Sequence, residues 1–386
     1  MIPYGKQDIS NEDIDAVIDV LRSEFLTQGP VVPEFENAIA GKVKAKYGVA
    51  LNSATSALHV ACLALGVGEG DWVWTSSNSF VASANCALYC GANVSFVDIN
   101  SRTYNIDTVK LEEKLIQAKF KGVLPKVVIP VHFAGQSCDM KRIRELSNEF
   151  GFKVIEDASH AIGAEYLGKP VGGCEFSDIT VFSFHPVKII TTAEGGLATT
   201  NDKFLANEMT LLRSHGISRD NKVIGPEVDG PWHYKQLKLG FNYRMTDLQA
   251  ALGLSQLKKL EDFIGKRREI AKYYNKHLID TDWVIPHQED YQKSSYHLYV
   301  IKLPVDLIKQ KKSVYETLIN QGIGVNVHYI PIHTQPYYTG LGIEHGDLSA
   351  TIEFYERALT IPIFPSLSQA DQELIVERLK GLEGWL

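Results

Sequence analysis

Lys126-Val-Val-Ile-Pro-Val131 and Phe152-Lys-Val-Ile-Glu156 are two short apolar runs, and an amphipathic segment over residues 139–150 separates them. Short runs rich in valine and isoleucine predict buried strands, and a helical segment between two of them predicts a βαβ unit with parallel strands. The same rhythm extends in both directions, which predicts an α/β protein with a mainly parallel, mixed sheet. Further strands are expected at residues 48–52, 71–75, 93–97, 180–184 and 196–200, and further helices at 11–26, 33–46, 80–91 and 107–118. Another amphipathic helix is expected from the segment 53–58 onward.

The pattern changes near residue 246. A helix is predicted through Leu248–Leu257 after a cap at Thr246–Asp247, and a charged helical stretch follows from Lys258 to Lys276. We therefore expect a large domain over residues 1–258, which includes an N-terminal segment, and a smaller α+β domain over residues 259–386. Strands at 297–301 and 324–328 and helices at 312–321 and 369–381 are expected in the second part.

Composition excludes several classes of protein. The 386 residues are 45% hydrophobic and 22% charged, which is ordinary for a globular chain. The net charge of −7 gives no basic excess for nucleic acid, and no apolar run is long enough to span a membrane. The first eight residues contain no apolar signal core, so we expect a cytoplasmic protein. Five scattered cysteines without a CxxC pair predict reduced thiols and no metal site.

Asp157 directly follows the strand predicted at residues 152–156. An acidic residue at the C-terminal end of a buried parallel strand lies where open α/β sheets bind their ligands. A carboxylate there can hold a protonated ring nitrogen, because ion pairing favours both charged forms. The alternative interpretation is that Asp157 is the N-cap of a helix.

Lys188 belongs to a glycine- and proline-punctuated loop between the strands predicted at 180–184 and 196–200. Desolvation beside apolar strands lowers the pKa of a lysine and frees its amine for Schiff-base chemistry. The alternative is a solvated surface lysine. Ser183, five residues earlier, and Asp157, one strand earlier, favour the catalytic interpretation.

The segment Asn52-Ser-Ala-Thr-Ser-Ala57 leads from a predicted strand into a predicted helix. Its small residues let the backbone approach an anion, and the N–H groups at a helix start favour a phosphate. The alternative is a plain N-capped helix. The chain lacks GxxxxGK[ST], HExxH and GxSxG, and no GxGxxG follows a strand. These absences disfavour nucleotide hydrolases, zinc peptidases, α/β-hydrolases and Rossmann oxidoreductases.

Taken together, these segments resemble the sugar aminotransferases of the DegT/DnrJ/EryC1/StrS family over essentially the whole chain. Two positions depart from many members, which carry glutamine in place of His160 and glycine in place of Ala54, although both residues are familiar in one subgroup. The motifs that carry the resemblance are Leu26–Pro30, Asn52–Leu58, Phe80–Asn85, Gly91–Asp98, Glu156–Ala161, Ser183–Gly196, Leu212–Gly216, Gly240–Asp247, Gly253–Leu257 and Val327–His333.

The resemblance implies the fold type I of enzymes that use pyridoxal 5'-phosphate (PLP), with pyridoxamine phosphate as intermediate. It implies that Lys188 binds the cofactor covalently and that Asp157 pairs with its pyridinium nitrogen, so these two residues are the expected catalytic pair. His160 is expected near the polar edge of the cofactor ring, and Phe80 is expected to stack on its face. The implied phosphate contacts are Ala54, Thr55, Ser56, Ser183 and, from a neighbouring subunit, Asn242.

The resemblance also implies a homodimer that takes a UDP-linked 4-keto sugar and L-glutamate, with no nucleic-acid or membrane partner. The anionic sugar nucleotide meets an acidic protein, so local donors such as the start of the 53–57 segment and Arg244 are expected to hold it. The implied substrate contacts are Tyr4, Glu24, Phe25, Leu26, Thr27, Asn242, Arg244, Asn326, Val327, His328 and Tyr329.

Within the family, the run around Lys188 looks most like the aminotransferases of pseudaminic acid biosynthesis, which make UDP-4-amino-4,6-dideoxy-N-acetyl-β-L-altrosamine. Three alternatives remain. The transferases of the UDP-4-amino-4-deoxy-L-arabinose type share Ser183–His185 and Ala193–Gly196. Sugar dehydratases of the same fold carry histidine where Lys188 stands. A non-catalytic sugar-binding protein of the same fold is expected to have lost Lys188, Asp157 or Asn242, and all three are present.

Overall fold

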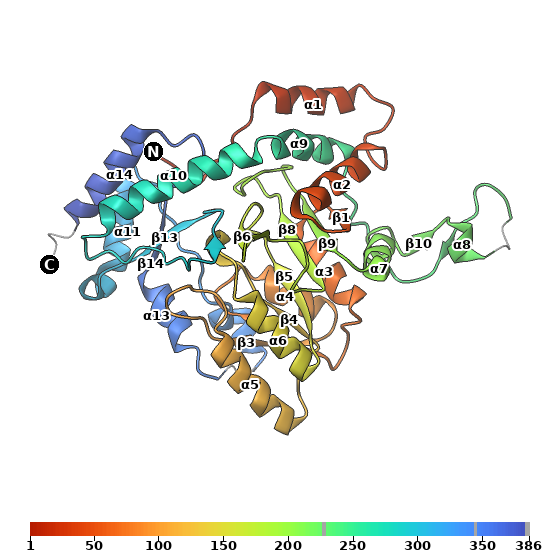
Figure 1. Ribbon diagram of the computed structural model, residues 1–386, viewed down its shortest axis with the longest axis horizontal. Helices are drawn as coiled ribbons and strands as arrows, with labels where there is room; N and C mark the ends of the chain where they lie inside the picture. Colours follow the sequence, from red (N-terminus) through yellow and green to blue (C-terminus); the bar gives the residue numbers. More distant parts are fainter. Residues whose placement is uncertain (226–228, 343–345, 383–386) are drawn as a thin grey trace.

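A seven-stranded sheet lies at the centre of the computed structural model, which describes residues 1–225, 229–342 and 346–382 (Figure 1). Five neighbouring strands are parallel, and β9 is antiparallel to both β8 and β1. The mainly parallel sheet of the predicted α/β fold is therefore confirmed. In spatial order the strands are β1 (Tyr47–Leu51), β9 (Gly196–Thr200), β8 (Ile179–Ser183), β5 (Lys153–Asp157), β4 (Val127–Ile129), β2 (Trp72–Ser76) and β3 (Asn93–Val97).

Helices cover both faces of this sheet, and the residues of β5 alternate between them. Ile155 packs in one core with α3, α4 and α7, whereas Val154 packs in another core with α5 and α6. Because side chains on a strand point alternately to opposite faces, Asp157 lies on the side of Ile155 and Glu156 on the side of Val154. The helices are α1 (Asn11–Leu21), α2 (Val31–Val43), α3 (Ala54–Ala64), α4 (Ala82–Tyr89), α5 (Thr108–Lys121), α6 (Met140–Phe150), α7 (Lys203–Arg213) and α9 (Asp247–Leu257).

A separate core forms in the C-terminal part, where α10 (Leu260–Leu278), α11 (Lys311–Asn320) and α14 (Gln369–Gly381) surround the antiparallel pair β13 (Tyr299–Lys302) and β14 (Ala358–Ile361). The start of the chain joins this part, because the N–H of Ile2 donates to the carbonyl of Gly322 at 2.7 Å. Conversely, Ile332 and Tyr338 pack into the core of the large sheet. The contacts of Ile2, Ile332 and Tyr338 therefore link the two parts of the chain. The domain boundary at 258/259 stays a prediction.

Two of the expected elements differ clearly from the observed ones. The first helix ends at Leu21 rather than residue 26, because the Ser23 hydroxyl donates to the carbonyl of Val20 at 2.8 Å and closes the last turn. Residues 324–328 form one isolated bridge, Asn326 to Thr360, in place of a strand. The remaining elements are η1 (Phe133–Gly135), β6 (Glu165–Tyr166), β7 (Lys169–Pro170), β10 (Ile217–Ser218), α8 (Asn221–Ile224), β11 (Lys235–Gln236), β12 (Gln292–Lys293), η2 (Val305–Gln310), η3 (Ile332–Thr334), α12 (Pro336–Gly340) and α13 (Ser349–Arg357).

No helix in the described ranges is both long enough and apolar enough to cross a membrane. The five cysteines are unpaired, and all but Cys90 are buried. Within the same ranges, the His, Cys, Asp and Glu side chains form no group of three arranged to hold a metal ion.

Candidate active site

Asp157 ends β5 with its carboxylate buried on the α3/α4 side of the sheet, where it is 4% exposed. Its Oδ2 accepts a hydrogen bond from the Ser83 hydroxyl of α4 at 2.7 Å. Its Oδ1 accepts from the hydroxyl and the N–H of Ser159, at 2.5 and 3.1 Å. Donors on both oxygens stabilise the ionised carboxylate, so a fixed negative charge lies at the C-terminal end of this strand.

Lys188 lies in the loop between β8 and β9, flanked by the buried Ile189 and Ile190. Desolvation lowers the pKa of Lys188 to about 8, and the negative charge of Asp157 opposes this effect. Its amine makes no hydrogen bond or ion pair with any residue that the structure describes. A lysine with this pKa is about one tenth neutral at pH 7, far more than an ordinary lysine, and this fraction is available as a nucleophile.

The loop that carries Lys188 is held in shape by hydrogen bonds of its own. The N–H of Thr192 and the hydroxyl of Thr191 both donate to the carbonyl of Phe184, at 3.0 Å each. The side-chain amide of Gln249, on α9, donates to the carbonyl of Glu194 at 2.8 Å. The loop is therefore braced on both sides of the lysine.

His160 is buried beside Lys188, and its two ring nitrogens have different partners. Nδ1 accepts the N–H of Ala134 at 3.2 Å, so it carries no proton. Nε2 lies 3.1 Å from the Tyr329 hydroxyl and is therefore the protonated nitrogen, which donates to that oxygen. Desolvation, followed by the nearby charges of Lys188 and His328, holds the pKa of His160 well below its usual range. His160 is a neutral hydrogen-bonding group.

Aromatic side chains surround this group. The ring of Phe80 is 58% exposed, with its centroid 6.3 Å from that of Tyr329. The ring of Tyr4 lies 5.4 Å from that of His328. Desolvation, together with the charge of Lys188, lowers the pKa of His328 to about 3. Tyr4, Phe80, His328 and Tyr329 thus form one aromatic cluster beside His160.

The start of α3 lies beside the first residue of β9. A Cβ added to Gly196 would be 2.4 Å from the backbone nitrogen of Ala54, so only glycine permits this approach. The Ser53 hydroxyl caps the helix by accepting the N–H of Ser56 at 3.1 Å. Because β8 pairs with β9 through Ser183 and Gly196, the Ala54–Ser56 turn and Ser183 are held near one another. This arrangement offers N–H groups and a hydroxyl to an anion.

Several predicted residues lie elsewhere in the single chain. The backbone of Thr27 pairs with Thr246, so Glu24, Phe25, Leu26 and Thr27 lie beside the start of α9, and all four are exposed. Arg244 is paired through its backbone with Leu51. The side chain of Asn242 is exposed and makes no hydrogen bond to any described residue. The side chain of Asn326 accepts the N–H of Val327 at 2.8 Å and so points back to its own backbone.

Three residues of the site were missed by reasoning from the sequence. Ser83 and Ser159 hold Asp157, and the buried His297 packs against His160 with ring centroids 4.4 Å apart. Ser159 had a local signal, because an aspartate side chain commonly accepts the backbone N–H two residues further on. His297 had none, since the approach to His160 depends on how the C-terminal part packs on the sheet.

Comparison with known proteins identifies the family. Residues 7–380 match the model of the DegT/DnrJ/EryC1/StrS aminotransferase family. The chain belongs to this family. It is 40% identical over 384 residues, spanning 98% of this chain and 96% of the relative, to a UDP-4-amino-4,6-dideoxy-N-acetyl-beta-L-altrosamine transaminase of Campylobacter jejuni (strain 81-176).

Solved structures agree with this assignment. Helicobacter pylori PseC, an aminotransferase involved in the biosynthesis of pseudoaminic acid, matches with a TM-score of 0.91 and 33% identity over 100% of both chains. A putative sugar aminotransferase of Streptococcus pneumoniae, Spr1654, matches in its PMP form with a TM-score of 0.90 and 30% identity over 100% of this chain and 99% of that one. The PLP form of that protein gives 0.89 and 30%, over 99% and 98% of the two chains.

The protein is therefore a PLP-dependent sugar aminotransferase of fold type I. Its own residues fit the cofactor. A lysine with a lowered pKa, a buried carboxylate and a glycine-permitted helix start are the groups that a PLP aldehyde, a protonated ring nitrogen and a phosphate require, respectively. The predicted family, fold, enzyme class and cofactor are confirmed, whereas the role of each residue stays a prediction.

Proposed function

We propose that this aminotransferase moves an amino group from L-glutamate to C4 of a UDP-linked 4-keto-6-deoxy-N-acetyl sugar, and so makes UDP-4-amino-4,6-dideoxy-N-acetyl-β-L-altrosamine. The observation that carries amino transfer is the Lys188 amine, whose pKa is lowered to about 8 in a site that also holds the buried Asp157 carboxylate. The named activity of the C. jejuni relative supports the choice of sugar.

Lys188 and Asp157 have different roles in the proposed reaction. Bound PLP supplies an electron sink for the carbanion formed next to the substrate nitrogen. Asp157 keeps the pyridinium nitrogen protonated, because its ionised carboxylate favours the charged ring. The Lys188 amine would hold the cofactor and, once free, would move a proton at the substrate carbon, as base and then as acid.

Hydrogen-bond donors and aromatic rings account for the binding of the remaining parts. The Nε2–H of His160 donates to Tyr329, and burial, together with the charge of Asp157, raises the pKa of Tyr329, so the phenol keeps its proton for a ligand oxygen. We assign Phe80 to stacking on the cofactor and Ala54, Thr55, Ser56 and Ser183 to its phosphate. Tyr4, His328 and Tyr329 contact the sugar nucleotide in this proposal.

The test is a product analysis. Purified protein, PLP and L-glutamate are incubated with separate UDP-4-keto sugars, and the amino sugars are identified by NMR. We expect UDP-4-amino-4,6-dideoxy-N-acetyl-β-L-altrosamine as the main product. A preference for UDP-4-amino-4-deoxy-L-arabinose would replace the sugar in the proposal, and binding of every sugar without any product would favour a non-catalytic role.

We further propose that the active form is a homodimer in which Asn242 and Arg244 reach the partner's site. An apolar groove of ≈ 390 Å³ runs between α1 and the Lys188 loop and is lined by Ile9, Ile14, Val17 and Pro186. Ile9 and Ile14 are more than 40% exposed in the single chain, at 43% and 49%. A second copy would bury these side chains and bring its own exposed Asn242 near the neighbouring phosphate site.

Complementation tests the shared site. Lys188→Ala and Asn242→Ala are each expected to be inactive as homodimers. When the two are mixed and allowed to exchange subunits, up to about one quarter of wild-type activity should return, because half of the sites in each mixed dimer combine an intact Lys188 with an intact Asn242. No recovery in a mixture shown to contain mixed dimers would assign Asn242 to its own subunit's site. In the control mixture, Lys169→Ala takes the place of Asn242→Ala. This substitution changes an exposed lysine that is paired with Glu175.

We also propose a cytoplasmic location. The five cysteines are unpaired, four of them buried, as is usual where thiols stay reduced.

A further inference from the structure

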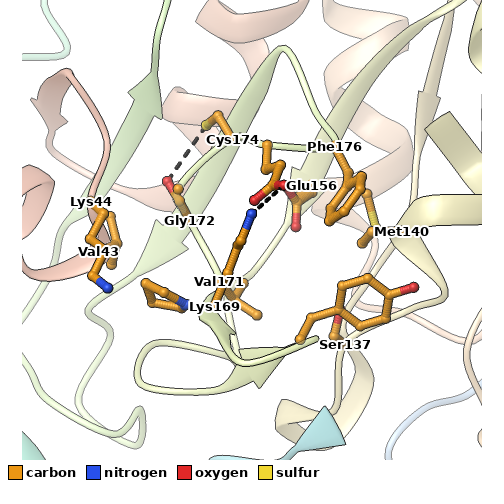
Figure 2. Close-up of a pocket in the computed structure, with 14 residues that line it drawn as sticks. Val43, Lys44, Ser137, Met140, Glu156, Lys169, Val171, Gly172, Cys174 and Phe176 are labelled. Carbon is orange, nitrogen blue, oxygen red and sulfur yellow. Dashed lines mark hydrogen bonds and ion pairs between the residues drawn. The ribbon is translucent and has the colours of Figure 1, made fainter. Parts of the chain in front are cut away.

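A carboxylate adjacent to Asp157 lies on the opposite side of the sheet and has no part in the chemistry described above. Glu156 is 5% exposed and borders a cavity of ≈ 240 Å³ on the α6 side of β5 (Figure 2). Desolvation alone would raise the pKa of Glu156, but hydrogen bonds from His132, Ser177 and Thr180 outweigh it and hold this pKa below its usual range. The side chain is therefore a buried, ionised acceptor.

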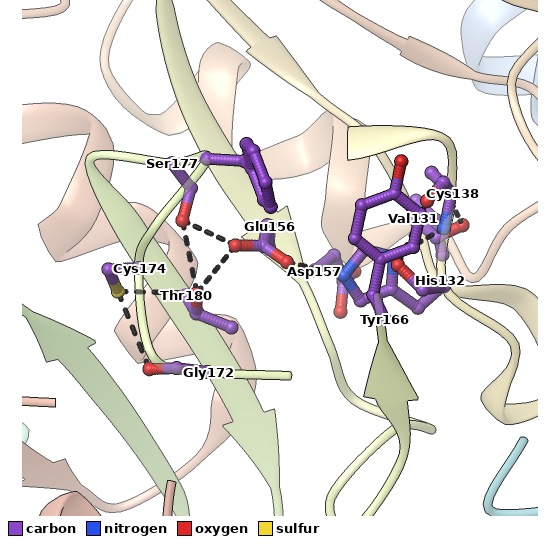
Figure 3. A network of polar contacts seen from close by, with 12 residues as sticks. Val131, His132, Cys138, Glu156, Asp157, Tyr166, Gly172, Cys174, Ser177 and Thr180 are labelled. Carbon is purple, nitrogen blue, oxygen red and sulfur yellow. Dashed lines mark hydrogen bonds and ion pairs between the residues drawn. The ribbon is translucent and has the colours of Figure 1, made fainter. Parts of the chain in front are cut away.

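His132 is hydrogen-bonded at both ring nitrogens. Its Nε2 lies 2.7 Å from Oε2 of Glu156, and its Nδ1 accepts the N–H of Cys138 at 3.1 Å. Because Nδ1 accepts, the proton is on Nε2 and is donated to the carboxylate. Figure 3 shows Glu156 between Ser177 and Thr180 on one side and His132 on the other. His132 thus links the Glu156 carboxylate to Cys138, at the C-terminal end of the loop formed by residues 132–138.

This loop carries the N–H that sets the tautomer of His160. Ala134 stands in the loop with a left-handed φ of 57°, and its N–H donates to Nδ1 of His160 at 3.2 Å. The N–H of His132 donates to the carbonyl of Asp157 at 3.0 Å, and the N–H of Gly135 donates to the carbonyl of His132 at 3.2 Å. A non-glycine residue at positive φ persists only when its surroundings hold it there.

We infer that Glu156 and His132 are positioning residues of the aminotransferase site, which act through the 132–138 loop to keep the proton of His160 on Nε2. We call the hydrogen bond between His132 and Glu156 the clasp. Without the clasp, the 132–138 loop relaxes and the N–H of Ala134 moves away from Nδ1 of His160. His160 can then place its proton on either nitrogen, and the donor to Tyr329 is lost in part of the molecules. This inference rests on the proposed role of His160 beside the cofactor.

The substitution Glu156→Gln tests the clasp by reversing one donor. The two hydroxyls of Ser177 and Thr180 both donate to Oε1 of Glu156, so the glutamine oxygen should take that place. Its NH₂ group then faces the Nε2–H of His132, donor against donor. His132 can accept from this NH₂ group only if its proton moves to Nδ1. Nδ1 then no longer accepts the N–H of Cys138.

The readout is the protonation of His160 in the cofactor-free protein, measured by NMR of ¹⁵N-labelled histidine side chains and assigned with His160→Gln. Wild type should show an unprotonated Nδ1 and a protonated Nε2. Glu156→Gln should show a mixture of both tautomers. Glu175→Gln, the same change at an exposed residue on the rim of the same cavity, should match wild type. A wild-type pattern in folded Glu156→Gln overturns the inference.

A second variant separates the clasp from the burial of charge. His132→Gln can still donate to Glu156 but no longer accepts the N–H of Cys138, so it should lose the single His160 tautomer while the carboxylate stays paired. Loaded with PLP, both variants should bind cofactor and lose kcat by on the order of 10-fold to 100-fold, as for a slightly misplaced group. An unchanged tautomer in His132→Gln also contradicts the inference. The NMR experiment uses no sugar, so its result tests the inference even when the proposed sugar is not the substrate.

Discussion

Lys188→Ala is expected to abolish turnover of the keto sugar, with kcat lowered by at least about 10⁴-fold. The reason is that one amine performs two tasks, covalent attachment of the cofactor and proton transfer at the substrate carbon, and no other described lysine lies beside Asp157. The purified variant should also lack the visible absorption that a lysine-bound cofactor gives. Rates and absorption are measured on the same preparation.

The control for this substitution is Lys169→Ala, which removes an exposed lysine that is paired with Glu175. It should keep both the absorption and the rate of wild type. Full turnover by Lys188→Ala would refute the assignment of this residue, whatever the cofactor content of the protein.

Asp157→Asn is expected to retain part of the cofactor but to lose kcat by on the order of 10³- to 10⁴-fold. Asparagine keeps the size of the side chain and can still accept from Ser83 at 2.7 Å in the wild-type geometry. It has no negative charge, however, and cannot favour a protonated ring nitrogen. The substitution therefore separates the charge of Asp157 from its shape. A rate equal to wild type would remove Asp157 from this role.

The same variant has a second readout, the titration of Lys188. In cofactor-free wild type, labelling of Lys188 by an amine-reactive reagent should increase with pH and reach half its maximum near pH 8, since desolvation lowers its pKa to about 8. The charge of Asp157 raises this pKa, so its removal should move the midpoint to lower pH. Peptide mass spectrometry measures both. A midpoint in Asp157→Asn above that of wild type would contradict the electrostatic account, and Asp306→Asn, an exposed residue on η2, is the control.

The parallel sheet could be predicted because its information is local. The strands β4, β5 and β8 contain valine and isoleucine in short apolar runs, and β3 and β9 have the predicted limits. The three-stranded sheet of β12, β6 and β7 was not predicted, since each strand has only two residues and β12 pairs with β6 across more than a hundred positions. The end of α1 was also missed, because the Ser23 hydroxyl ends the helix inside a run that still reads as helical.

The candidate site likewise contains residues that could be predicted from the sequence and residues that could not. Asp157 and Lys188 could be found because each is a charged residue directly after a predicted strand or in the loop between two predicted strands. Other groups of the site come from elsewhere in the chain: Ser83 of α4 donates to Asp157, and Tyr329 of the C-terminal part is hydrogen-bonded to His160. Their selection depends on tertiary packing. The His132–Glu156 pair was hidden for a further reason, because alternation along β5 sends Glu156 away from the site that its neighbour serves.

The most direct measurement of the central claim is a single half-reaction. Wild-type protein loaded with PLP is mixed with L-glutamate in the absence of any sugar, and 2-oxoglutarate is quantified against the number of active sites. Amino transfer through Lys188 predicts about one equivalent of 2-oxoglutarate per site, followed by amino-sugar formation when a UDP-4-keto sugar is added. No 2-oxoglutarate from fully loaded protein with L-glutamate, and no oxo acid with any other amino donor, would contradict it.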